Sequence, residues 1–121
     1  MDEKVDIKSL ELDEIVKIGC ISKEVEILPK VKMKMHTVFG KENTEIIKRI
    51  SIETEDLSKL NALRVYTLVY AIDEINGKKY TVEQKVEFLQ NVQPTLFNLM
   101  FNKYNELIEE QIKVIDDLKK K

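Results

Sequence analysis

The amino-acid sequence predicts an α+β fold that is mainly helical, with an N-terminal β-hairpin packed on a bundle of about four helices. Apolar residues recur every three or four positions over most of residues 41–119, which is the period of amphipathic helices. Apolar and polar residues alternate over residues 24–38, which is the period of a half-buried strand. Only 3 Gly and 2 Pro interrupt the 121 residues, so long uninterrupted elements are expected.

Residues 1–20 form the least defined part of this single predicted domain, which spans residues 1–121. A short helix could begin after Ser9 as its N-cap and end at Gly19. A loosely attached arm is the alternative. The apolar side chains that would line the short helix are Leu10, Leu12, Ile15, Val16 and Ile18.

The hairpin is predicted over residues 24–38, and Pro29, which cannot donate to a strand ladder, marks a turn or an edge within it. Met33 and Met35 fall on the side expected to be buried, and Lys32 and Lys34 fall on the side expected to face water. A lone hairpin is marginally stable in water, so it must pack on the helices or on another chain.

Four helices are expected in residues 41–119. The first covers residues 41–50, and the second runs from a cap at Asp56 or Ser58 to about Ile75 and is apolar enough to be the central one. The third begins at the capping-box sequence of residues 81–84 and ends near residue 91. The long fourth helix begins at Pro94, a residue tolerated in a first helical turn, and ends near Lys119.

Composition argues against several functional classes. The 20 basic and 22 acidic residues give a net charge of −2, so no net basic field is available to attract nucleic acid. No apolar run approaches the roughly 20 residues that a membrane helix needs, and residues 1–6 lack the plan of a signal peptide. A single cysteine favours a reducing compartment, so we expect a cytoplasmic protein without a membrane or nucleic-acid partner.

The side chains that usually perform catalysis are scarce. Cys20 and His36 are the only cysteine and histidine, and a catalytic dyad between them has no supporting sequence context. The three glycines are scattered, so no phosphate-binding loop is expected, and no acidic cluster has calcium-loop spacing. We therefore expect no enzyme activity and no catalytic, cofactor-binding or metal-binding residue.

Two surfaces are predicted to contact a partner protein. In the second half of the last helix, few internal neighbours remain for the apolar stripe, so it could pair with another helix. An ordinary internal core is the competing interpretation. Lysines on the hairpin form the second surface, although protection of an edge strand would explain them equally well. The predicted contact residues are Ile108, Ile112, Ile115, Leu118, Lys32 and Lys34.

The order of these elements resembles that of small phage tail assembly chaperones and of baseplate-hub assembly proteins of contractile-tailed phages. The resemblance covers roughly residues 25–118 and is carried by the segments ILPKVKMKMHTVFG, GKENTEIIKRI, DLSKLNALRVYTLVYAIDEINGKKY and LFNLMFNKYNELIEEQIKVIDDLKK. Arg64 and the pair Asn76-Gly77 match the expected plan of the central helix, but the chain is shorter than the hub-assembly proteins and lacks their metal-binding cysteines.

The resemblance implies a non-enzymatic assembly protein that binds tail or baseplate components, such as the helical tape measure protein. A structural subunit retained in the virion is one alternative, and a small cytoplasmic adaptor or regulatory module is another. Because the apolar helix would also suit a dimer or a ring, the sequence leaves the oligomeric state open.

Overall fold

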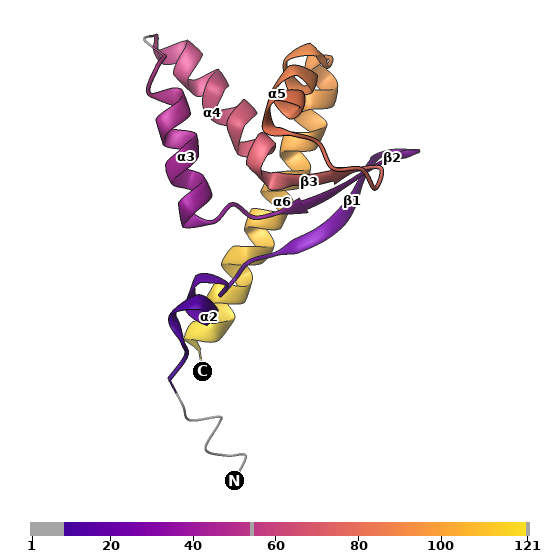
Figure 1. Ribbon diagram of the computed structural model, residues 1–121. Coiled ribbons are helices and arrows are strands. Elements are labelled where there is room, and N and C mark those ends of the chain that lie inside the picture. Colours follow the sequence, from indigo (N-terminus) through magenta and orange to yellow (C-terminus); the bar gives the residue numbers. More distant parts are fainter. Residues whose placement is uncertain (1–8, 54, 121) are drawn as a thin grey trace.

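The computed structural model describes residues 9–53 and 55–120 and shows a mainly helical α+β fold (Figure 1). Helix α2 covers Leu12–Val16, and strands β1 and β2 cover Ser22–Leu28 and Val31–His36. Helices α3 and α4 cover Gly40–Ile50 and Asp56–Ala71, and strand β3 covers Ile72–Ile75. Helices α5 and α6 cover Val82–Asn91 and Pro94–Lys119. The hairpin, the four-helix bundle of α3–α6 and the long C-terminal helix confirm the predicted architecture.

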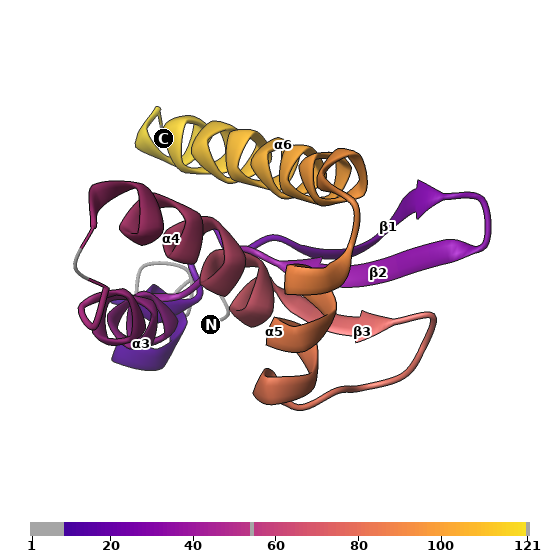
Figure 2. The same ribbon diagram turned by 90° about the horizontal axis from the view of Figure 1, so that it is seen from above.

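The three strands form an antiparallel sheet in the order β1-β2-β3, with β1 and β3 at its edges. Val25 pairs with Met33, which in turn pairs with Ile75, so these side chains share the inner face of the sheet. Met33 and Met35 are buried there, as the alternation predicted. The turn end of the hairpin projects beyond the helices (Figure 2).

The hydrophobic core lies between the inner face of the sheet and helices α4 and α6. Helix α4 lies centrally and contacts α3, α5 and α6, which confirms the central position predicted from its apolar character (Figure 2). Arg64 lies over the rings of Phe97 and Phe101 at 5.1 and 5.0 Å and thereby joins α4 to α6. The buried apolar residues of α4 and α6 are Val65, Leu68, Val69, Ala71, Phe97, Met100, Tyr104 and Leu107.

The sequence-based boundary of the central helix is wrong at its C-terminal end. We predicted a helix to about Ile75, but α4 ends at Ala71 and Ile72–Ile75 form β3 beside β2. Residues 69, 72 and 75 satisfy helical spacing, yet β-branched side chains also favour a strand when a partner edge is present. The segment 41–119 is therefore not wholly helical, and the hairpin belongs to a three-stranded sheet.

Most of the predicted element ends are confirmed, but two predicted caps are wrong and α2 ends at Val16, before the predicted end at Gly19. Thr81 accepts a hydrogen bond from the backbone N–H of Gln84 (3.1 Å), as the capping box requires. Helix α2 begins after Glu11 and not after Ser9, and α4 begins after Glu55, whose side chain makes no capping hydrogen bond. Asn76 and Gly77 form the turn after β3, both at positive φ.

None of the described helices is both long enough and apolar enough to cross a membrane.

Candidate protein-binding surface

The apolar face of α6 continues past the end of the hydrophobic core. Positions 107, 111, 114 and 118 follow one another at helical spacing, so they lie on one face of the helix. Leu107 is fully buried on that face, whereas Leu118 retains 46% of its surface. Ile112 and Ile115 continue the neighbouring row, which starts at Ile108, and we call Ile112, Val114, Ile115 and Leu118 together the distal stripe. The same helix face therefore changes from core to open surface within three turns.

The four α6 residues predicted to bind a partner differ in their surroundings. Ile108 packs against the core and is partly buried. Ile112 and Leu118 are exposed, and Ile115 is partly covered. The structure thus places three of the four in the distal stripe and leaves Ile108 at the boundary between stripe and core.

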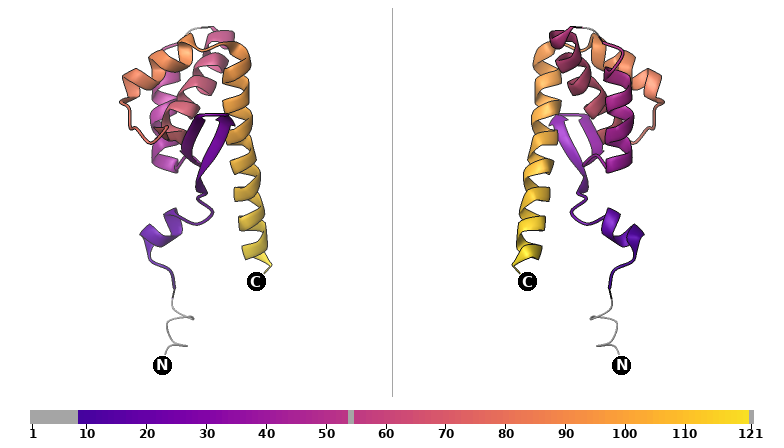
Figure 3. Two further views of the ribbon diagram at one scale, coloured as in Figure 1. Left: turned by 90° about the vertical axis from the view of Figure 1, so that its right-hand side faces the viewer. Right: turned by 90° about the vertical axis from the view of Figure 1, so that its left-hand side faces the viewer.

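The N-terminal arm, residues 9–20, lies at the same end of the molecule as the last turns of α6 (Figure 3). Helix α2 is rich in apolar side chains, yet none of its residues is buried. Its exposed large apolar residues, together with those on either side, are Leu10, Leu12, Ile15, Val16 and Ile18. Exposed apolar side chains of α2 and of the last turns of α6 therefore lie toward the same end of the domain, although the two helices themselves stand apart (Figure 3).

The arm approaches α6 at Gly19, which lies against the side chain of Ile115. The φ of Gly19, +79°, lies in the left-handed region, and a Cβ atom built there would lie 2.9 Å from Cδ1 of Ile115. Further along the chain, Lys23 pairs with Glu110 at 2.6 Å, and the Gln111 side chain donates to Oγ1 of Thr37 at 3.2 Å. The absence of a side chain at position 19 lets the backbone pass close to Ile115.

We expect Gly19→Ala to loosen the arm. Alanine in a left-handed conformation costs about 1–2 kcal/mol, and its Cβ would also displace Ile115. Limited proteolysis should therefore cut the arm faster in this variant than in the wild type. Gly40→Ala is the matched control, because nothing lies within 4 Å of a Cβ at this exposed helical position. Equal cleavage rates in both variants would contradict the proposed role of Gly19.

The charged side chains around this end are mostly acidic. Residues 9–18 and 106–120 contain eight acidic and four basic side chains. Glu109 and Asp116 lie on α6 beside the stripe, and Asp13 and Glu14 lie in the first turn of α2. The apolar surface is therefore set in a net negative environment.

Lys32 and Lys34, the predicted strand contacts, are exposed on the outer face of the sheet. In the strand register, Lys34 lies between Glu24 of β1 and Glu74 of β3, and Lys32 lies opposite Glu26. Oppositely charged cross-strand neighbours stabilise a sheet by about 0.2–1 kcal/mol per pair. The sheet's own glutamates thus provide a structural explanation for both lysines.

His36 is held between two carboxylates. Its Nδ1 lies 2.9 Å from Oδ1 of Asp73 on β3, and its Nε2 lies 2.8 Å from Oε1 of Glu42 on α3. Burial lowers the pKa of His36, but the hydrogen bonds and the charges of Glu42 and Asp73 together raise it above its ordinary value. Because both ring nitrogens face carboxylates, His36 is not free to act as a general base for Cys20.

Lys85 on α5 also belongs to this polar cluster. Its Nζ donates to the backbone carbonyl of Ile72 at 2.8 Å. Burial lowers the pKa of Lys85, and the negative charges of Asp73 and Glu42 oppose that shift. Among the described residues, no group of three or more His, Cys, Asp or Glu side chains is arranged to hold a metal ion.

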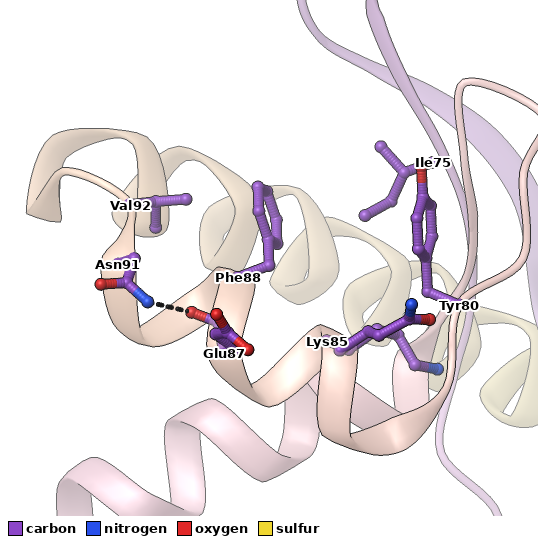
Figure 4. Close-up of a pocket in the computed structure, with 8 residues that line it drawn as sticks. Ile75, Tyr80, Lys85, Glu87, Phe88, Asn91 and Val92 are labelled. Carbon is purple, nitrogen blue, oxygen red and sulfur yellow. Dashed lines mark hydrogen bonds between the residues drawn. The ribbon is translucent and has the colours of Figure 1, made fainter.

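A hollow of about 720 Å³ lies between α5 and the end of β3 (Figure 4). Its apolar side chains are Ile75, Tyr80, Phe88 and Val92. The polar groups around it are partly engaged within the protein, since Lys85 bonds Ile72 and Asn91 donates to the backbone carbonyl of Glu87 at 2.7 Å. This hollow suits the apolar side chain of a partner better than a polar small molecule, which needs converging free polar groups.

Sequence reasoning missed the hollow and the partners of His36. Phe88 and Val92 are four residues apart on α5, a helical spacing that could have indicated an apolar face. The contact between His36 and Asp73 has no sequence signal, because it depends on the unpredicted strand β3. Comparison with protein-family models, curated proteins and solved structures finds no match to this chain.

Proposed function

We propose that this protein is a non-enzymatic binding protein that holds a helical segment of another protein on the distal stripe of α6 and the adjacent arm. The observation that carries this proposal is the stripe itself, which continues the core face of α6 into solvent. Large apolar side chains that cluster at one end of a small domain are typical of a protein-interaction site. Residues at helical spacing are suited to pack against another amphipathic helix.

The partner segment is an amphipathic helix with basic residues beside its apolar face. The eight acidic and four basic side chains of residues 9–18 and 106–120 favour such a helix over an acidic one. The same charges disfavour pairing of two copies through this end, because each would bring the same net negative charge. A foreign helix is therefore the occupant to which the proposal commits.

The resemblance to phage tail assembly proteins supplies the class of partner. On that resemblance, the helix belongs to a tail or baseplate component such as the tape measure protein, and the protein acts during assembly. A minor virion subunit would use the same surface but would persist in purified particles. A cellular adaptor would use it on a partner unrelated to tails. Mass spectrometry of purified particles separates the virion subunit, which persists there, from the other two roles.

We expect the full chain to bind a synthetic amphipathic helix of leucine and lysine in a saturable manner, and to lose that binding in the double variant Ile112→Asp, Leu118→Asp. Both side chains are exposed, so the variant should stay folded, whereas a charge in an apolar interface opposes binding. Isothermal titration calorimetry measures the affinity, and we expect a decrease of at least about tenfold, or 1.4 kcal/mol.

Two controls make this result specific. The double variant Leu60→Asp, Leu63→Asp places the same two charges on exposed apolar residues of α4, away from the stripe, and should bind like the wild type. A leucine–glutamate helix should bind much more weakly than the leucine–lysine helix. If the Ile112→Asp, Leu118→Asp variant binds as tightly as this α4 variant does, the stripe is not the binding surface.

A further inference from the structure

The two edges of the sheet differ in whether their outward-facing backbone N–H and C=O groups already have hydrogen-bond partners. At the β3 edge, the N–H and the carbonyl of Ile75 are both hydrogen-bonded to Lys78, and the carbonyl of Ile72 accepts from Lys85. Asn76 donates to the carbonyl of Lys32 on the opposite side, so Ile75 faces away from β2. The turn after β3 thus closes this edge.

Among residues 9–53 and 55–120, no strand or turn is hydrogen-bonded along the outer edge of β1, and helix α6 packs on β1 from the inner face, where Lys23 pairs with Glu110 at 2.6 Å. The N–H of Thr37 donates to the carbonyl of Ile21 at 2.9 Å, which fixes the alternation of the ladder. Residues 21, 23 and 25 therefore point their backbone groups toward β2. Ser22, Glu24 and Glu26 point theirs outward, and no other strand neighbours β1 in the described sheet. This edge can accept a further strand.

Charges on the outer face indicate which strand would fit. Across the sheet, Glu24, Lys34 and Glu74 follow one another, and Glu26 lies beside Lys32. A fourth strand that continues this alternation carries a basic side chain opposite Glu24 and another opposite Glu26. Its intervening residues fall on the inner face beside half-buried Val25, where apolar side chains fit.

A second copy of this chain does not fit the same edge. In an antiparallel pair of two β1 strands, any register that overlaps most of the strand sets a glutamate opposite a glutamate, at position 24 or 26. Like charges directly opposite one another destabilise a sheet. The same glutamates that prevent self-association therefore leave the edge selective for a basic strand.

We propose that β1 is a second interaction surface, which adds an extended segment of a partner protein with alternating basic and apolar residues to the sheet. Backbone hydrogen bonds to Ser22, Glu24 and Glu26 hold the segment, and the two glutamates select its charge. This surface is separate from the distal stripe, and it does not depend on the stripe binding a helix.

The test uses the full chain and a capped peptide of alternating lysine and valine, with a glutamate–valine peptide as its counterpart. Calorimetry should show saturable binding of the lysine peptide alone. Glu24→Pro removes one outward N–H without removing a bond to β2, and proline is tolerated at such edge positions. Because the variant loses this hydrogen bond and also the charge of Glu24, we expect it to bind the lysine peptide about tenfold more weakly.

The charge-reversal variant Glu24→Lys, Glu26→Lys gives an independent readout if the proline variant fails to fold. It should prefer the glutamate peptide. Lysine-peptide binding that survives backbone N-methylation of the peptide would overturn the proposal, since attraction without a ladder would then suffice. Failure of the wild type to bind the peptide would also overturn it and leave the glutamates as protection against aggregation. The Ile112→Asp, Leu118→Asp variant should retain lysine-peptide binding, which distinguishes the two surfaces.

Discussion

Replacing Leu107 by alanine should destabilise the protein by about 2–5 kcal/mol, whereas replacing Leu118 should change its stability by less than about 0.5 kcal/mol. Both leucines lie on the same face of α6, but Leu107 is fully buried and Leu118 retains 46% of its surface. Truncation of a buried leucine removes apolar burial and leaves a cavity. Truncation of Leu118, which is about half exposed, removes little burial and leaves no enclosed cavity. Urea unfolding followed by circular dichroism measures both values.

This pair of variants locates the point at which the α6 stripe stops being core. Total stabilities of about 5–15 kcal/mol are usual for domains, so the Leu107 variant should lose a large share. A cost of more than about 2 kcal/mol for Leu118→Ala would show that the distal stripe is covered within the free protein. The account of a free surface would then be wrong.

The free energy of unfolding should fall as the pH rises from about 6.5 through the raised pKa of His36. Below that range, His36 is protonated in both the folded and the unfolded states, and its ion pairs stabilise the fold fully. Between the two pKa values, only the folded state holds the proton, so stability decreases by about 1.4 kcal/mol per pH unit. Above the folded-state pKa, the contribution is lost.

The physical cause is the position of the ring between Asp73 and Glu42. A neutral imidazole donates only one hydrogen bond, so one carboxylate would face an unprotonated ring nitrogen. His36→Gln should remove this component of the pH dependence, because glutamine does not titrate and His36 is the only histidine. Denaturant titrations at several pH values should show a steeper decline for the wild type. If the free energy of unfolding falls equally steeply with pH in both proteins, the ion pairs of His36 with Asp73 and Glu42 do not stabilise the fold.

The parts of the fold that depend on local sequence could be predicted. The alternation around Met33 and Met35 gave the hairpin and its buried face, and Pro94 marked the start of the longest helix. Thr81 and Gln84 satisfy each other's backbone N–H groups within one helical turn, so their capping box is also local. These signals lie within a few residues of the structure that they determine.

The remainder depends on contacts between distant residues. Ile72–Ile75 became a strand because β2 offers it a ladder, with Met35 opposite Ile72, although its spacing also fits a helix. His36 ends strand β2, and its partner Asp73 lies 37 residues further along the chain, so the sequence carries no local signal for their contact. For the same reason, the sequence predicted a shortage of neighbours for the distal stripe, but not which of its residues would contact Gly19.

The central claim is that the distal stripe is open in the free protein and becomes covered when a helix binds. The most direct measurement is the rate at which a thiol reagent modifies the variant Cys20→Ser, Leu118→Cys, with and without a saturating leucine–lysine helix. The account predicts rapid modification of the free protein and strong protection by the peptide. Slow modification of the free protein, or a rate that the peptide leaves unchanged, would contradict it.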